Sequence, residues 1–147
     1  MDLVASVEVP VSVEKLFAYV ADLANYSSWL EFVHKVELVA ESNETDATWL
    51  VELRAKLGVL ARSKRLRMTR TVCEAPRLVV FERREQDARR HSAWVLRATV
   101  SETANGAKLE TNLHYSGSLF TGGMLERALN EQIATGREKL IQQLSAK

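Results

Sequence analysis

The sequence contains a single cysteine, Cys73, which excludes an intrachain disulfide and any cysteine-rich metal site. We expect Cys73 to pack as a small hydrophobic residue on a strand. Long apolar runs are also missing, and none approaches the roughly 20 residues that a membrane-spanning helix requires. The amino terminus carries Asp2 and no basic region followed by an apolar core, a pattern that is not typical of a secretory signal. These absences predict a cytoplasmic protein.

Catalytic and metal-binding motifs are equally scarce. His34, His91 and His114 show neither HExxH spacing nor a helical pair at i and i+4, which argues against a zinc site. The sequence has no GxSxG elbow, P-loop or Rossmann glycine pattern, and Thr121-Gly122-Gly123 lacks the lysine and the spacing of a phosphate-binding loop. We therefore expect neither a hydrolase nor a nucleotide-dependent activity, and we expect no metal and no cofactor.

What the sequence does contain is a clear order of patterns in a chain of 147 residues, which we expect to form one domain over residues 1–147. The stretch Leu3–Val9 alternates apolar and polar residues as a strand does. Pro10-Val11-Ser12 then leads into apolar residues spaced by three and four, which predict a helix carrying Val13 through Leu23. A second short helix is expected to open at Asn25–Trp29.

Twofold alternation then replaces helical spacing and predicts six further strands. Turn-forming residues separate them, and the Asn105-Gly106 pair is a strong hairpin signal. On the strand that begins at Ala47, the alternation places Trp49, Val51 and Leu53 on the inward face. The strands are expected at His34–Glu41, Ala47–Ala55, the stretch between Gly58 and Pro76, Arg77–Arg84, Ser92–Val100 and Lys108–Gly117.

Helical spacing returns between Thr121 and Leu144 and predicts a long amphipathic helix. At 1.5 Å per residue this helix reaches about 36 Å, enough to lie across the whole sheet. At Gly136 we expect a close approach of the helix to the sheet, and the alternative is a kink over a cavity. This order of elements predicts a curved antiparallel sheet with helices at one mouth, where an apolar ligand can bind.

The order of elements resembles that of the START-like (SRPBCC) superfamily, and Val7–Phe17 and Val20–Trp29 carry the most specific part of the resemblance. These residues resemble the opening of bacterial proteins grouped as polyketide cyclase/dehydrase and lipid transport, and less closely the coenzyme Q-binding branch. The resemblance implies an α+β helix-grip fold, with a curved antiparallel seven-stranded sheet, two short helices and a long carboxyl-terminal helix. It also implies a deep cavity between the sheet and that helix, which in members holds lipids, sterols or polyketides. The opening motif marks the fold and transfers no catalytic residue.

Inward-facing residues on the predicted strands and the long helix supply the expected wall of this cavity. Each of them is equally an ordinary core residue. Tyr115 and Trp94 add a hydroxyl and an indole donor, and Tyr115 is the best single candidate for proton transfer if the protein is an enzyme. Arg70 either meets an anionic head group or forms a salt bridge at the strand end. The predicted ligand-binding residues are Trp49, Val51, Leu53, Leu66, Met68, Arg70, Trp94, Leu96, Leu113, Tyr115, Met124 and Leu125.

The charge of the chain is unevenly distributed, although its net value is only +1. Between Arg54 and Arg90 there are 12 Lys or Arg and four Asp or Glu, whereas the rest of the chain has eight basic and 15 acidic residues. This pattern predicts either a solvated outer sheet face or a surface for an acidic protein or a membrane. Nucleic acid is not expected as a partner, because aromatic residues are not interleaved with the basic positions.

These observations favour a noncatalytic carrier or sensor of a hydrophobic small molecule, such as a lipid, a quinone or a polyketide. One alternative is a polyketide-type cyclase/dehydratase that uses the same cavity, and another is a protein-interaction module that uses the basic sheet face. The inward pattern is mostly apolar and shows no obvious acid and base pair, which favours the carrier over the enzyme.

Overall fold

The computed structural model describes residues 2–39, 47–57, 60–116 and 124–145, without the side chains of residues 55–57, 60–62, 124–126, 128 and 129. Seven strands in these ranges form one antiparallel sheet in the order β1-β7-β6-β5-β4-β3-β2, which confirms the expected α+β helix-grip class. The strands are β1 (Asp2–Val9), β2 (Val33–Leu38), β3 (Thr48–Leu57), β4 (Leu60–Glu74), β5 (Leu78–Arg83), β6 (Trp94–Thr103) and β7 (Gly106–Tyr115). The helices are α1 (Val13–Val20), the 3₁₀ helix η1 (Leu23–Ser28) and α2 (Met124–Ser145).

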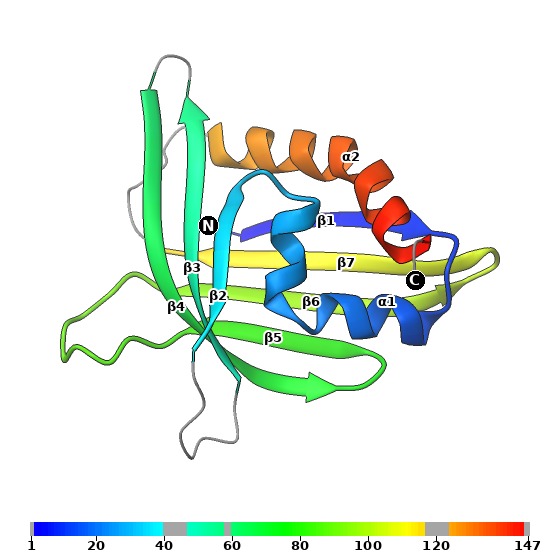
Figure 1. Ribbon diagram of the computed structural model, residues 1–147, viewed down its shortest axis with the longest axis horizontal. Helices are drawn as coiled ribbons and strands as arrows, with labels where there is room; N and C mark the ends of the chain where they lie inside the picture. Colours follow the sequence, from blue (N-terminus) through cyan, green and yellow to red (C-terminus); the bar gives the residue numbers. More distant parts are fainter. Residues whose placement is uncertain (1, 40–46, 58–59, 117–123, 146–147) are drawn as a thin grey trace.

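The sheet bends so strongly that β2, β3 and β4 run across the direction of β1, β7, β6 and β5 (Figure 1). All three helices lie on the same side of the sheet (Figure 1). Strand β4 belongs to both parts, because it pairs with β3 over most of its length and with β5 through its second half. The β4–β5 register shifts between Arg70 and Val72, and an irregularity of this kind increases the bend and twist of a strand.

Local signals in the sequence explain the two short helices. Ser12 caps α1, its hydroxyl accepting a hydrogen bond from the Lys15 backbone N–H at 3.2 Å. Asp22 caps η1 in the same way, accepting from the Ala24 backbone N–H at 3.0 Å. The second helix therefore begins two residues earlier than the Asn25 predicted from the sequence, because the carboxylate of Asp22 supplies its cap.

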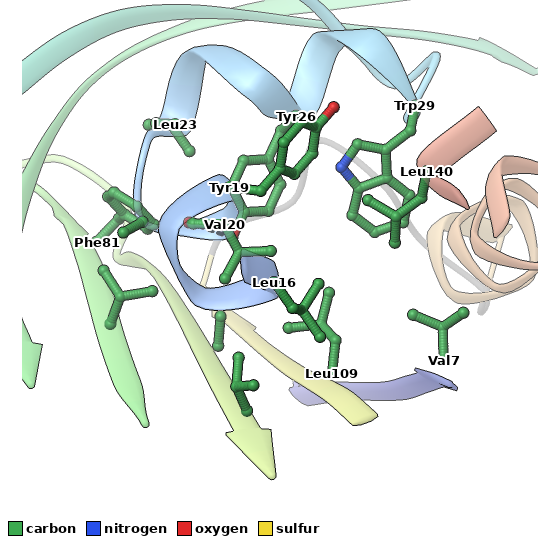
Figure 2. Close-up of a cluster of buried hydrophobic side chains, with 14 of the residues drawn as sticks. Val7, Leu16, Tyr19, Val20, Leu23, Tyr26, Trp29, Phe81, Leu109 and Leu140 are labelled. Carbon is green, nitrogen blue, oxygen red and sulfur yellow. Dashed lines mark hydrogen bonds between the residues drawn. The ribbon is translucent and has the colours of Figure 1, made fainter. Parts of the chain in front are cut away.

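The helices and the sheet share one hydrophobic core. Figure 2 shows side chains of α1, of η1 and of Trp29 after it directed into the same cluster as Phe81 and Leu109 of the sheet and Leu140 of α2. Leu16, Phe81 and Leu140 are completely buried. The predicted phase of β3 and β4 is confirmed over their paired centre, where side chains of alternate residues face this core.

Cys73 corrects an expectation, because its side chain is exposed rather than packed in the core. It lies at the end of β4, where Cys73 through Arg77 are all exposed as the chain turns into β5. The alternation of β4 also ends at the register shift, after which Val72 is only half-buried. Alternation therefore predicts burial only as far as the regular pairing continues.

The β6–β7 hairpin predicted from Asn105-Gly106 is present, but β6 continues to Thr103 rather than ending at Val100. Thr103 pairs with Gly106, which leaves a two-residue turn. A Cβ atom on Gly106 would lie 2.2 Å from the carbonyl oxygen of Val9. Gly106 is therefore required by the close approach of the end of β1.

The long helix covers less of the sheet than expected. Among the elements, α2 mainly contacts β1, η1 and α1, and α1 itself occupies the space against β6 and β7. A Cβ atom on Gly136 would lie 2.3 Å from the Trp29 carbonyl oxygen. The close approach predicted at Gly136 therefore exists, but its partner is the residue after η1 rather than the sheet.

Candidate functional site

An apolar pocket of about 90 Å³ lies between the concave face of the sheet, the segment from η1 to β2, and α2. Its volume is smaller than the roughly 150 Å³ cavity that takes up benzene in an engineered protein core. In this conformation the pocket therefore has room for part of a larger ligand. The lining residues are Leu3, Leu23, Tyr26, Trp29, Leu30, Phe32, Val33, Val51, Leu53, Leu66, Met68, Trp94, Leu96, Thr111, Leu113 and Ile133.

The structure brings together most of the predicted ligand-binding residues of the sheet. Leu96 and Leu113 are half-buried, so they are the part of the predicted wall with the fewest packing constraints. The side chains of Met124 and Leu125 lie outside the described part of the chain. The predicted ligand-binding residues that line the pocket are Val51, Leu53, Leu66, Met68, Trp94, Leu96 and Leu113.

Trp49 and Arg70 face the same side of the sheet but lie away from the pocket wall. The Trp49 ring packs edge-on against Phe81, with ring centroids 5.5 Å apart. The Arg70 guanidinium lies 5.7 Å from the centroid of the Trp49 ring, and its Nη1 donates to the Ala21 carbonyl at 2.7 Å. Arg70 thus holds the end of α1, a role that differs from both roles considered for it from the sequence.

Tyr115 is likewise inward-facing without lining the pocket. Its ring stacks on Trp94 at a centroid distance of 5.0 Å, and only 2 % of the residue is exposed. In this position Tyr115 supports the Trp94 indole that does line the pocket. Its use in proton transfer stays a prediction.

Part of the wall comes from a segment that sequence reasoning did not assign to the cavity. This segment follows η1 and contributes Trp29, Leu30, Phe32 and Val33. Helix α2 holds it in place, since the Phe32 backbone N–H donates to Gln132 Oε1 at 2.6 Å. These partners are 100 residues apart, so no local signal could have placed the segment at the pocket. The sequence pattern predicted only a short helix that opens at Asn25–Trp29.

The pocket wall contains few polar atoms. Tyr26 donates its hydroxyl hydrogen to the Val20 carbonyl at 2.9 Å, and Thr111 donates to the Ala5 carbonyl at 3.4 Å. Among the described residues, those that line the pocket include no Asp, Glu, Lys, Arg or His. Burial, and secondarily the neighbouring Tyr19, raises the pKa of Tyr26 far above the ordinary value for tyrosine. The Tyr26 phenol therefore stays protonated across the physiological range.

A polar cluster borders the pocket where Arg83 pairs with Met68 across β4 and β5. The Arg83 side chain is only 9 % exposed, and its Nε donates to Glu85 at 2.7 Å. Its Nη2 faces His91 Nδ1 at 3.3 Å, and His91 Nε2 lies 2.6 Å from Asp87. The arginine has most of its donors engaged within the protein, which gives this cluster a structural role at the end of the sheet.

Charged groups in and beside this cluster have shifted pKa values, among them Glu85 and the neighbouring Lys64. Burial alone would raise the pKa of Glu85, but hydrogen bonds from the Arg83 side chain and the Arg67 backbone outweigh it and lower the pKa. Burial lowers the pKa of Lys64, and the nearby positive charge of Arg83 lowers it further. The cluster therefore stabilises negative charge on Glu85 and disfavours additional positive charge.

The outer face of the basic region is partly neutralised by acidic side chains. Glu52 lies 3.3 Å from both Arg54 and Arg65, and 3.7 Å from His34. Exposed pairs of this kind contribute little to stability. Binding of an acidic protein or a membrane at this face stays a prediction.

Neither a metal cluster nor a membrane-spanning helix occurs in the described ranges. No group of three or more His, Cys, Asp or Glu side chains there is placed to hold a metal ion. None of the helices in the same ranges combines the length and apolar character needed to cross a bilayer.

The bent sheet with helices on its concave side is the START-like architecture. Residues 1–145 match the family described as polyketide cyclase/dehydrase and lipid transport, so the chain belongs to this family. Among curated proteins, none matches this sequence.

Several solved structures share the fold at low sequence identity. A protein from Thermus thermophilus aligns with a TM-score of 0.74 and 15 % identity over 99 % of this chain and 98 % of its own. A START superfamily protein from Mycobacterium smegmatis aligns with a TM-score of 0.70 and 14 % identity, covering 99 % and 97 %. A STAR-related lipid transfer protein from Xanthomonas axonopodis gives 0.65 and 15 %, covering 97 % and 84 %. At these identities the likeness establishes the fold alone.

Proposed function

We propose that this protein binds a hydrophobic small molecule in the apolar pocket and acts as a carrier or sensor of that molecule. The observation that carries the proposal is the composition of the wall, whose described residues are almost entirely apolar and include no charged side chain. Membership of a family that includes lipid transport, and likeness to a lipid transfer protein, support the same class of ligand.

The size of the pocket adds a condition to this proposal. At about 90 Å³, it is smaller than a benzene-binding cavity and holds only part of a lipid, quinone or polyketide, so binding of the remainder requires movement of the wall. Three neighbouring wall residues of β6 and β7, Leu96, Thr111 and Leu113, are half-buried, so we assign the opening to the side of these two strands.

The family name also includes cyclases and dehydratases, and such an enzyme needs a group that transfers protons beside its substrate. The polar side chains of the described wall are poorly suited to this. Tyr26 keeps its proton because burial raises its pKa, and Tyr115 lies behind Trp94 rather than at the wall. We therefore place carrier function first.

The test combines native mass spectrometry of the protein purified from its own host with a thermal-shift panel of lipids, quinones and polyketide-like aromatics. We expect a bound apolar molecule and an increase in the melting temperature. The variant Leu113→Trp fills the pocket and should abolish both effects. The control Asn112→Trp places the same ring on the opposite face of β7 and should leave both unchanged. Binding that survives Leu113→Trp would place the ligand elsewhere.

A further inference from the structure

Two buried hydrogen-bond donors in the pocket wall lack an acceptor. Trp29 and Trp94 both line the pocket, and each is only 2 % exposed. The Nε1 atoms of these two residues have no hydrogen-bond partner among the described residues. Buried donors without a partner are rare in native proteins, because the lost hydration is not replaced. Two such donors in one small pocket require an explanation.

The third tryptophan differs from these two in both respects. Trp49 is also buried, at 3 % exposure, but it does not line the pocket. Its indole nitrogen is not among the buried atoms without a partner. The unpaired indole donors thus coincide with the pocket wall.

Both indoles are held firmly by their neighbours. Trp94 stacks on Tyr115 at 5.0 Å, and Trp29 lies 6.1 Å from the Tyr26 ring. Figure 2 shows the nitrogen edge of Trp29 turned towards Tyr26. A Cβ atom on Gly136 would lie 3.2 Å from Trp29 Cε3, so α2 closes the other side of the ring. Packing therefore holds both rings in place in the absence of a ligand, with their nitrogen atoms covered.

The chemistry of these donors selects a ligand class. An indole N–H donates and cannot accept, so its partner must present an acceptor atom. The other wall hydroxyls, of Tyr26 and Thr111, already donate to backbone carbonyls. A carboxylate would be buried without a cation in the described wall, which is strongly unfavourable. A neutral oxygen meets the requirement at the lowest cost in hydration.

We propose that the ligand of this pocket carries a neutral carbonyl oxygen, as in a ketone, ester or quinone, which accepts a hydrogen bond from Trp29 Nε1, Trp94 Nε1 or both. This inference rests on the proposed function, because it defines the ligand of the same pocket. Each nitrogen is covered by protein atoms, so binding includes a small turn of the indole as the wall opens. The hydrogen bond then forms in a dry site, where it also fixes the orientation of the ligand.

The first experiment observes the donors directly. The three indole N–H resonances are followed by ¹H–¹⁵N NMR while the protein is titrated with acetophenone, with ethylbenzene, in which a methylene replaces the carbonyl, or with benzoate. We expect acetophenone to shift the resonance of Trp29 or Trp94 downfield beyond any shift caused by ethylbenzene, and to leave Trp49 unaffected. Benzoate should bind more weakly than either neutral probe.

The second experiment compares affinities in three matched variants, Trp29→Phe, Trp94→Phe and Trp49→Phe. Without a hydrogen bond, burial favours ethylbenzene, because acetophenone loses the hydration of its carbonyl. The ratio of the two affinities therefore reports the hydrogen bond and cancels the effect of lost ring volume. We expect Trp29→Phe or Trp94→Phe to lower the acetophenone preference about fivefold to tenfold. Trp49→Phe should leave the ratio unchanged.

The outcomes separate the two proposals. If neither neutral probe binds the wild-type protein, the proposed function fails and this inference falls with it. If both bind, but the affinity ratio is the same in all three variants and no indole resonance responds to the carbonyl, the inference alone is overturned. Should a variant fail to fold, the resonance shifts in the wild-type protein still decide the question.

Discussion

The substitution Gly136→Ala tests how α2 is seated on the pocket. On an isolated helix this change stabilises by about 1 kcal/mol, because alanine has the higher helix propensity. Here the added Cβ would lie 2.3 Å from the Trp29 carbonyl oxygen, a distance that real Cβ atoms essentially never show. The helix or the segment must then separate by about 1 Å to restore ordinary van der Waals contact.

Neither side of this contact is free to move. Gln132 binds the Phe32 backbone N–H at 2.6 Å on one side of Gly136, and Arg137 Nε donates to the Glu8 carbonyl at 3.1 Å on the other. Overpacking of this kind costs about 1–3 kcal/mol. Subtracting the gain of about 1 kcal/mol in helix propensity leaves a net loss of up to about 2 kcal/mol in the free energy of unfolding. For a domain of this size, that lowers the melting temperature by up to about 8 °C.

Thermal unfolding followed by circular dichroism measures the effect. Thr135→Ala is the matched control, because the neighbouring residue is exposed and the change adds helix propensity without a clash. We expect Thr135→Ala to raise or preserve the melting temperature while Gly136→Ala lowers it. If Gly136→Ala were as stabilising as the control, the close packing of α2 on Trp29 would be refuted.

Three further predictions follow from single contacts, each measured by urea unfolding. Glu85→Gln should lower stability at neutral pH by roughly 1.5–3 kcal/mol through the weakened bond to Arg83. The folded-state pKa of Glu85 is lowered, so the difference in the free energy of unfolding between wild type and variant should persist above pH 4.5. It should disappear as the pH falls through that lowered pKa, and a difference that is independent of pH would contradict the pairing with Arg83. Leu66→Ala should cost about 2–5 kcal/mol and enlarge the pocket, so that larger apolar probes bind more tightly; unchanged binding would place Leu66 outside the site. Arg70→Met should cost about 1.5–3 kcal/mol by removing the donor to a carbonyl at the end of α1, whereas the exposed control Arg77→Met should change stability by less than about 0.5 kcal/mol.

The charged region of the sequence illustrates a limit of composition. The excess of basic residues between Arg54 and Arg90 predicted either a solvated outer sheet face or a surface for an acidic protein or a membrane. In the fold, Arg83 turns to the concave side and binds Glu85, Arg70 holds α1, and Arg65 pairs with Glu52. Charge counted along the chain does not predict charge on a face, because strand neighbours alternate between the two faces and pair with other strands.

The sequence by itself determined the elements and their inward faces. A capping residue and apolar residues spaced three and four positions apart defined α1. Alternation of apolar and polar residues placed Val51, Leu53, Leu66 and Met68 on the concave side of the sheet. These signals are local, because they depend on dihedral preferences and on which side of a strand a residue occupies.

Only the tertiary structure decided which inward residues border open space. Trp49 and Tyr115 share the concave face with the wall, but Phe81 and Trp94 fill the space in front of them. Trp29 reaches the wall because α2, more than 100 residues later in the chain, packs against it at Gly136. The pocket is what remains after the helices have packed on the bent sheet, and that remainder depends on contacts between distant segments that no local pattern records.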